Sequence, residues 1–260
     1  MWRMCWRLGL CMGLSLLLTL SVAKCFAAPA KPVLKWCLDE LPPRHSFVNG
    51  VPQGYVVDMM QQLAESAGFA LSFSQPTPLS RCLADMKNGK TDLMAGLLTS
   101  AERTTFMKLW PVDEAKPATA FIRKNQPAFG NRQLFSGRKV VLAKTRVYPD
   151  AVLQQLTDAT VIYAEDVDAA LALLWYGDAD IMLGPQYITS FAISKNKRYA
   201  ETLTQSAVQP LAAEAVIGHI GLSRASRHYH LAPKIEQALQ QILDAQKLQT
   251  PQVEPSGLTD

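Results

Sequence analysis

The chain has 260 residues, of which 48% are apolar and 18% are charged, and its formal net charge at pH 7 is +4. Three of its 26 basic residues, Arg3, Arg7 and Lys24, lie in an apparent leader, which leaves 23 basic against 22 acidic residues. A nearly neutral remainder gives no support to nucleic acid or an anionic membrane as a partner, and its apolar content supplies core for one large domain or two small ones.

The first predicted segment is a secretory signal peptide over residues 1–27. An apolar stretch from Leu8 to Val22 follows basic residues and ends in small residues, and polar Lys24 comes too early for a membrane span. Cys25 follows Lys24 rather than the small residue that a lipoprotein signal requires. We therefore expect a soluble, exported protein.

Two of the five cysteines, Cys37 and Cys82, lie outside this leader. Two cysteines in an exported chain favour one disulfide, which encloses 45 residues and contributes about 4 kcal/mol in the chain-entropy model. The alternative is a reactive thiol pair, but neither residue belongs to a CxxC motif.

The first half of the exported chain alternates predicted strands and helices. Val33–Leu38 and Ala70–Phe73 are predicted strands, and the helix between them, Gly54–Gly68, has apolar residues at helical spacing and ends at a glycine. A second helix, Leu79–Asn88, leads to another short apolar strand. Alternation of this kind implies a parallel sheet.

An octet with the pattern G-x-x-D-[LI]-M-x-G occurs twice, at Gly89–Gly96 and Gly177–Gly184, and the copies are 88 residues apart. This spacing exceeds that of a solenoid repeat and favours two similar α/β lobes with a ligand cleft between them. The alternative is chance recurrence of a helix-glycine-strand connection. We interpret Asp92 and Asp180 as turn or capping residues away from the cleft.

The second half repeats the order of the first. The predicted elements are the strands 118–122, 139–143, 160–163, 180–183 and 215–223 and the helices 149–156, 167–176, 186–194 and 232–248. The predicted organisation is 31–120 as the first part of lobe 1, 121–214 as lobe 2, 215–249 as a returning strand and helix that complete lobe 1, and 250–260 as a disordered tail.

A candidate binding segment, Gly96–Arg103, lies where a strand gives way to a helix. Ligands of open α/β sheets bind at the carboxyl ends of strands, and Thr99 and Glu102 have the spacing of a capping box, so we expect the helix to begin at Thr99 or Ser100. The helix dipole disfavours Arg103 in the first turn unless its guanidinium holds an anion. The alternative is an exposed arginine paired with Glu102.

Several segments lie along the chain in a recognisable order and spacing: Pro42-Pro43, Gly54–Asp58, Gly89–Asp92, Thr99–Arg103, Gly177–Gly184 and Gly221–Ser223. Together they resemble the extracellular solute-binding protein family 3, the periplasmic receptors of polar-amino-acid-type ABC importers. The resemblance implies a two-lobed, hinged α/β fold of the periplasmic-binding-protein type II. It also implies a monomeric periplasmic protein that closes on a small solute and delivers it to an inner-membrane permease, with no cofactor.

In this family pattern the arginine that matches Arg103 binds a ligand carboxylate, assisted from the positions of Leu98 and Ser100. Leu98 stands where Ser or Thr is usual, and Pro185 stands where amino-acid binders place the aspartate for the ligand ammonium. These departures point to a more negative solute. The remaining residues of the predicted ligand-binding set are Arg44, Phe47, Arg146, Tyr148, Gln186 and Tyr187.

Two other functions stay open at this point. Some proteins of this fold are cyclohexadienyl dehydratases, whose chemistry needs a general acid, and Glu40 and Glu114 are the carboxylates near matched cleft positions. The third reading is a module that senses a ligand for a membrane receptor. We expect no metal site, because His228 and His230 have no acidic or cysteine residues close by.

Overall fold

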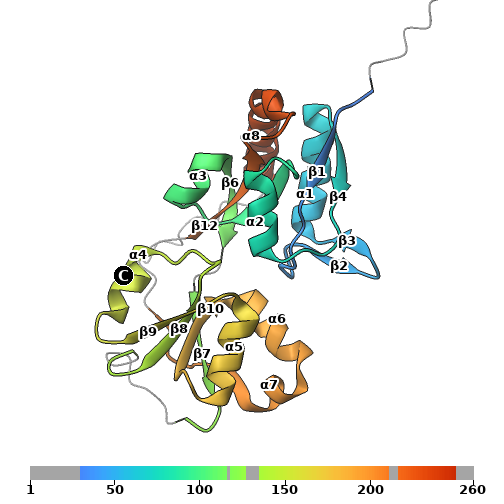
Figure 1. The fold of residues 1–260 in the computed structure, drawn as a ribbon. Coiled ribbons are helices and arrows are strands. Elements are labelled where there is room, and N and C mark those ends of the chain that lie inside the picture. Colours follow the sequence, from blue (N-terminus) through green and yellow to red (C-terminus); the bar gives the residue numbers. More distant parts are fainter. Residues whose placement is uncertain (1–29, 116–117, 127–134, 211–215, 250–260) are drawn as a thin grey trace, which may run out of the picture. The chain divides into compact units, whose positions relative to one another are not determined.

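Two five-stranded sheets with flanking helices form the described part of the chain (Figure 1). The structure is a computed structural model that describes residues 30–115, 118–126, 135–210 and 216–249. The predicted signal peptide, 1–27, and the predicted disordered tail, 250–260, lie outside the described residues. Everything described after Ala30 belongs to one unit, Lys31–Asp260.

The first sheet has the strand order β4-β1-β5-β12-β6. Its strands are β1 (Val33–Trp36), β4 (Ala70–Phe73), β5 (Leu93–Leu97), β6 (Met107–Ala115) and β12 (Val216–Ser223). Strands β1, β4 and β5 are parallel, as the alternation of strands and helices predicted, and β12 is antiparallel to β5 and β6. The segment predicted to return from lobe 2 therefore pairs with lobe 1.

Three helices pack on this sheet, α1 (Tyr55–Ala67), α2 (Leu79–Lys87) and α8 (Ala232–Gln249). The apolar face of α1, with Met60 and Leu63, meets that of α8, with Ile235 and Leu239, in one buried cluster that also takes in strand residues. Left-handed Gly68 ends α1, which confirms the predicted stop.

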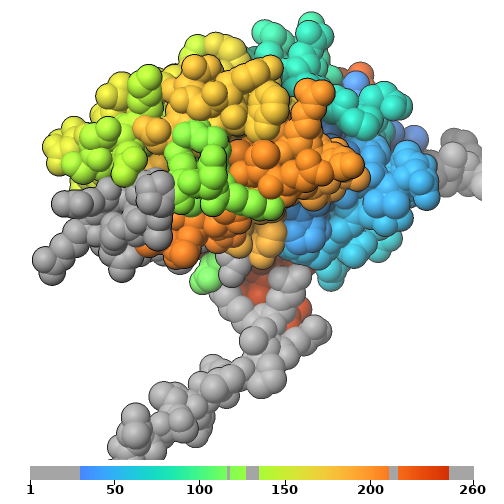
Figure 2. Space-filling view, turned by 90° about the horizontal axis from the view of Figure 1, so that it is seen from below, coloured from blue at the N-terminus to red at the C-terminus, as the bar shows by residue number. Residues whose placement is uncertain are grey.

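The second sheet has the order β11-β7-β10-β8-β9. Its strands are β7 (Ala118–Arg123), β8 (Lys139–Ala143), β9 (Thr160–Ala164), β10 (Ile181–Pro185) and β11 (Leu203–Gln205). Its helices are α4 (Asp150–Leu153), α5 (Val167–Tyr176), α6 (Gln186–Lys195) and α7 (Lys197–Thr202). The boundary predicted between residues 120 and 121 falls within β7. In Figure 2 the green to orange residues of this lobe form most of the near face.

Several elements escaped the sequence prediction. Edge strand β6 contains Pro111, which interrupts a strand pattern and which sheets tolerate only at their edges. The hairpin of β2 (Ser46–Val48) and β3 (Val51–Gln53) was also missed, as were α7 and β11. The predicted helix 149–156 is wrong in extent, because α4 ends at Leu153 and a 3-10 turn follows.

The aspartate of each octet joins two parallel strands. The Asp92 carboxylate accepts a hydrogen bond from the backbone N–H of Lys35 (2.7 Å), and the Asp92 N–H donates to the Lys35 carbonyl (2.8 Å). Asp180 makes the same pair of bonds with Lys139, at 2.9 and 2.8 Å. Each carboxylate thus caps a backbone N–H of the neighbouring strand, and neither aspartate lines the chamber described below, as predicted. What the sequence did not predict is that these bonds join a corresponding pair of strands in each lobe and so help to fix their register.

The predicted disulfide is confirmed. Cys37 and Cys82 are both buried and bonded, with their Cα atoms 5.6 Å apart, and they join the segment after β1 to α2. Among the described residues, no helix combines the length and apolarity needed to cross a membrane.

Breaking this disulfide tests how much the loop constraint stabilises the fold. The double variant C37A/C82A should lower the free energy of unfolding by about 4 kcal/mol, because the denatured chain regains the entropy of an open loop of 45 residues. Urea denaturation of oxidised wild type, reduced wild type and the variant measures this. A loss of unfolding free energy below 1 kcal/mol, in both the reduced wild type and the variant, would contradict the expectation.

Candidate functional site

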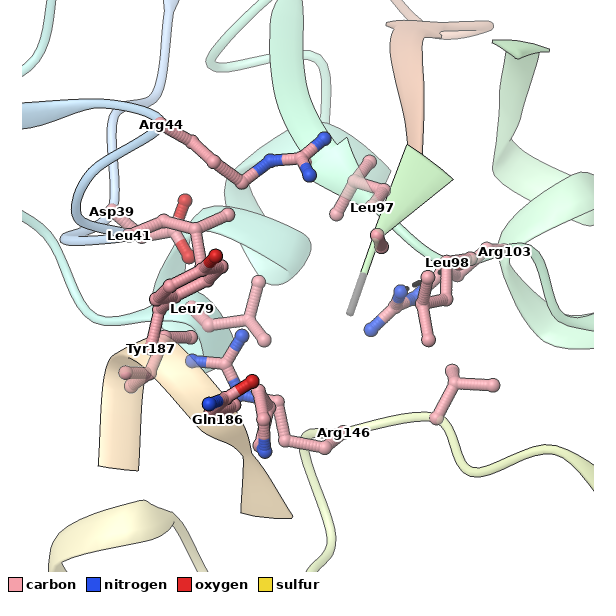
Figure 3. Close-up of a pocket in the computed structure, with 15 residues that line it drawn as sticks. Asp39, Leu41, Arg44, Leu79, Leu97, Leu98, Arg103, Arg146, Gln186 and Tyr187 are labelled. Carbon is pink, nitrogen blue, oxygen red and sulfur yellow. Dashed lines mark hydrogen bonds between the residues drawn. The ribbon is translucent and has the colours of Figure 1, made fainter. Parts of the chain in front are cut away.

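A small chamber lies where the carboxyl ends of β5 and β10 meet the loops that follow β1 and β8 (Figure 3). Its volume is about 80 Å³. It is lined by Asp39, Leu41, Arg44, Leu79, Gly96, Leu97, Leu98, Arg103, Ala115, Arg146, Val147, Pro185, Gln186, Tyr187 and Ile188. Both lobes contribute, and the lining is apolar apart from a few charged and polar groups.

A wider groove of about 670 Å³ adjoins the chamber. The two spaces share Asp39, Leu79, Arg146 and Ile188 in their walls. The groove lies between residues of α2 in the first lobe and of α6 in the second, so it borders the chamber on that side.

Arg103 is placed by the helix that begins at Ala101. Ser100 is the N-cap of α3 (Ala101–Phe106), and its hydroxyl accepts a hydrogen bond from the Arg103 N–H at 3.2 Å. Of the two residues predicted to open the helix, Ser100 is thus the N-cap, and the predicted capping box of Thr99 with Glu102 is not the one that forms. The Ser100 hydroxyl binds the helix backbone, and Ser100 does not line the chamber.

The Arg103 side chain is 6% exposed and reaches across to the second lobe. Its Nη1 donates to the Leu98 carbonyl (2.7 Å) and its Nη2 to the Thr145 carbonyl (3.1 Å). Burial, and then the charge of Arg146, lower the pKa of Arg103 to about 10, against an opposing effect of Asp39. The guanidinium is therefore still cationic at neutral pH.

Arg44, also buried, approaches the chamber from the loop after β1. It forms an ion pair with Asp113 of β6, and the Tyr55 hydroxyl donates to the other Asp113 oxygen at 2.9 Å. Burial, and then the bond to Asp113, raise the pKa of Tyr55 to about 12. The Arg44 Nε is buried and has no hydrogen-bond partner among the described residues.

Arg146 enters from the loop after β8. Its Nε is buried and, in the described chain, has no hydrogen-bond partner. Burial lowers the pKa of Arg146, and the nearby charge of Asp39 opposes that effect. In Figure 3 the guanidinium groups of Arg44, Arg103 and Arg146 surround one central space.

Asp39 is the site residue that the sequence prediction missed. It is 4% exposed, and His45 Nε2 lies 3.3 Å from its Oδ1. Burial alone acts to raise its pKa, but the hydrogen bond and charge of His45 and the charge of Arg146 outweigh burial, so the pKa is lowered. Its position directly after a buried strand that neighbours β5 was a usable signal.

Other predicted site residues divide into two groups. Leu98, Gln186 and Tyr187 line the chamber beside the arginines. Phe47 packs instead against the core of the first lobe, and the Tyr148 hydroxyl is taken up by backbone groups of Ala143 and Leu183. Neither aromatic ring belongs to the chamber wall.

The carboxylates considered for an enzyme lie elsewhere. Glu40 lines the wider groove and accepts a hydrogen bond from the Phe47 N–H at 3.1 Å, and Glu114 lies on β6. No cluster of metal-ligating side chains occurs within the described ranges, where His228 and His230 also lie.

Gly96 allows the chamber wall to pack. Its φ of +73° is unfavourable for other residues, and an added Cβ would overlap Leu41 Cδ2 and lie 3.3 Å from His45 Cε1. The last residue of the first octet thus lets Leu41 and His45 approach the end of β5.

Comparison with known proteins gives a family match over most of the chain. The model of the bacterial extracellular solute-binding proteins, family 3, matches residues 34–252. No curated protein sequence matches the chain significantly.

Solved structures share the two-lobed fold at low sequence identity. The amino acid ABC transporter substrate-binding protein AbpA of Streptococcus pneumoniae, bound to L-arginine, has 17% identity, with a TM-score of 0.62 over 85% of this chain and 92% of that one. A histidine kinase sensor domain has 19% identity and a TM-score of 0.63, over 85% of this chain and 93% of that domain. The BvgS periplasmic VFT2 domain of Bordetella pertussis has 18% identity and a TM-score of 0.62, over 82% of this chain and 93% of that domain.

Gly96→Ala should destabilise the protein more than the matched variant Gly68→Ala. Both glycines have left-handed φ angles, +73° and +78°, but a Cβ at Gly68 meets nothing within 4 Å. We expect Gly68→Ala to cost about 1 kcal/mol and Gly96→Ala at least 2 kcal/mol more, because Leu41 and His45 must move. Chemical denaturation measures both, and equal losses would contradict the packing argument.

The lowered pKa of Asp39 predicts acid-sensitive stability. An aspartate whose folded pKa lies below its unfolded value, near 3.9, stabilises the fold above that value and loses this contribution as pH falls through the folded pKa. Asp39→Asn should therefore show a smaller loss of unfolding free energy than wild type between about pH 5 and pH 2. Chemical denaturation at each pH measures this. The prediction is contradicted if the unfolding free energies of wild type and Asp39→Asn fall in parallel as the pH is lowered.

Proposed function

Because the chain belongs to the bacterial extracellular solute-binding proteins, family 3, we propose that it captures a small carboxylate-bearing solute and delivers it to an ABC importer. The solute is an amino acid or a related organic acid. It binds in the chamber between the lobes, in the periplasm, and the monomeric complex then docks on the permease in the inner membrane.

The observation that carries this proposal is the buried cationic guanidinium of Arg103 in the chamber wall. An arginine fork matches a carboxylate in a bidentate way, and an apolar surround strengthens that attraction. Arg103 now donates to two backbone carbonyls, which leaves donors of its fork for a solute. Three arginines and one aspartate line the chamber, so its charge favours an anion.

Solute contacts with both lobes would favour the closed form. The hydrogen bond from Arg103 to the Thr145 carbonyl already joins the first lobe to the second. A solute that binds Arg103 and also touches Gln186 or Tyr187 has a higher affinity for a form in which the two lobes are close together. Closure therefore provides the signal that a permease can recognise.

Sensing for a membrane receptor is the second candidate function. The histidine kinase sensor domain with the same fold favours it, whereas the arginine-bound ABC transporter protein favours delivery. Co-purification of tagged, solute-loaded protein with inner-membrane proteins separates the two, since one predicts a permease and the other a receptor kinase.

The chamber gives little support to dehydratase chemistry. Asp39 is its one lining carboxylate in the described part of the chain, and the lowered pKa of Asp39 keeps this group ionised at neutral pH. An ionised carboxylate cannot act as the general acid that such a reaction needs. Turnover of prephenate or arogenate by purified protein would reverse this conclusion.

Arg103→Gln tests the binding proposal. We expect a panel of amino acids and organic acids to contain a solute that stabilises wild type by about 2.7 kcal/mol at one hundred times its Kd. The variant should lose at least about 100-fold in affinity, since a buried charged hydrogen-bond donor is removed. Thermal shift and calorimetry measure both effects.

Arg81→Gln is the matched control, because Arg81 is exposed on α2, pairs with Asp85 and does not line the chamber. It should bind like wild type. The proposal fails if no member of the panel stabilises wild type, or if Arg103→Gln binds the solute as well as wild type does.

A further inference from the structure

The chamber holds more cationic groups than one carboxylate needs. Besides Arg103, it contains Arg44 and Arg146, each with a buried Nε–H that has no acceptor among the described residues. A buried donor without an acceptor costs free energy, and a ligand that supplies the acceptor removes that cost. These two donors therefore mark positions where a bound molecule should present oxygen atoms.

Arg44 is held in a defined position. Asp113 binds its Nη2, the Tyr55 hydroxyl binds the same carboxylate, and the Arg44 guanidinium lies 5.8 Å from the centre of the Tyr55 ring. Asp113 comes from β6, and Gly218 of the neighbouring β12 leaves room, since a Cβ there would lie 2.5 Å from Arg44 Nη2. The fork is thus fixed on one side, while the Arg44 side chain lines the chamber and its buried Nε–H has no acceptor among the described residues.

The chamber offers little negative charge to a cationic group on the solute. Asp39 is the one lining carboxylate among the described residues; its Oδ1 lies 3.3 Å from His45 Nε2, and it also faces the charge of Arg146. On the opposite wall, α6 begins with Pro185, Gln186 and Tyr187, none of them charged. The N-terminus of α6, the positive end of its helix dipole, lies in this wall, and the dipole favours negative charge in the chamber.

We propose that Arg44 forms a second anion subsite, that Arg146 adds positive charge near Arg103, and that the solute is a short dicarboxylate. This inference rests on the proposed function, because it assigns the first carboxylate to Arg103. The second carboxylate binds the Arg44 guanidinium and supplies the acceptor that its Nε–H group lacks. Arg44 is then a specificity-determining residue that selects a diacid over a monoacid of equal length.

Calorimetry with matched acids tests this. The probes are succinate with butyrate, glutarate with pentanoate, and alanine and glutamine as zwitterions. Wild type should bind one of the diacids at least tenfold more tightly than its matched monoacid. Arg44→Gln should lower diacid affinity by roughly 10–100-fold, so that the preference for the diacid is largely lost.

Further variants separate recognition from folding. Arg44→Lys keeps the charge but not the fork, so it should recover only part of the diacid preference. Asp113→Asn loosens Arg44 without removing it, so it should reduce the diacid preference less than Arg44→Gln does. The unliganded melting temperatures of all variants report any loss of folding. Arg81→Gln should match wild type.

Equal weakening of diacid and monoacid by Arg44→Gln in a folded variant would overturn the second subsite. Tight binding of alanine or glutamine through Arg103, with weaker diacid binding, would overturn the dicarboxylate inference and leave the proposed function intact. If no probe binds and the wider panel also fails, both proposals fall.

Discussion

Burial of several guanidinium groups in one largely apolar chamber is the constraint on which this site depends. Taking a charged group out of water costs several kcal/mol unless partners replace the lost hydration. Arg44 has Asp113, but within the described residues Arg103 donates to backbone carbonyls and Arg146 faces an aspartate that also contacts His45. Under the proposed function, an anionic solute would relieve this electrostatic cost, and that relief would favour a closed arrangement of the lobes.

The rest of the fold holds these cations in place. The disulfide joins the segment after β1, which leads to Asp39 and Arg44, to α2, and the octet aspartates fix the register of β5 and β10, whose ends open into the chamber. The two octets thus have one structural function. Their chemistry differs beyond the repeat, because the first leads to Ser100 and Arg103 and the second to uncharged Gln186.

Regular features of the fold were predictable from the sequence, because the spacing of apolar residues and the glycines and prolines at element ends determine them locally. Helix α1 between two glycines is an example, and so is the disulfide, which had no competing cysteine outside the predicted leader. Pro111 hid β6, since an edge position is a tertiary property. The place of Asp39 in the chamber wall, and of Phe47 and Tyr148 against the core, depends on contacts between distant segments. Residue type alone therefore did not show which side chains line the chamber and which pack in the core.

Native mass spectrometry of protein purified without unfolding tests the central claim most directly. The account predicts a co-purified organic acid bound to wild type and absent from Arg103→Gln prepared in parallel. A bound molecule without any acidic group, retained equally by wild type and Arg103→Gln, would contradict it.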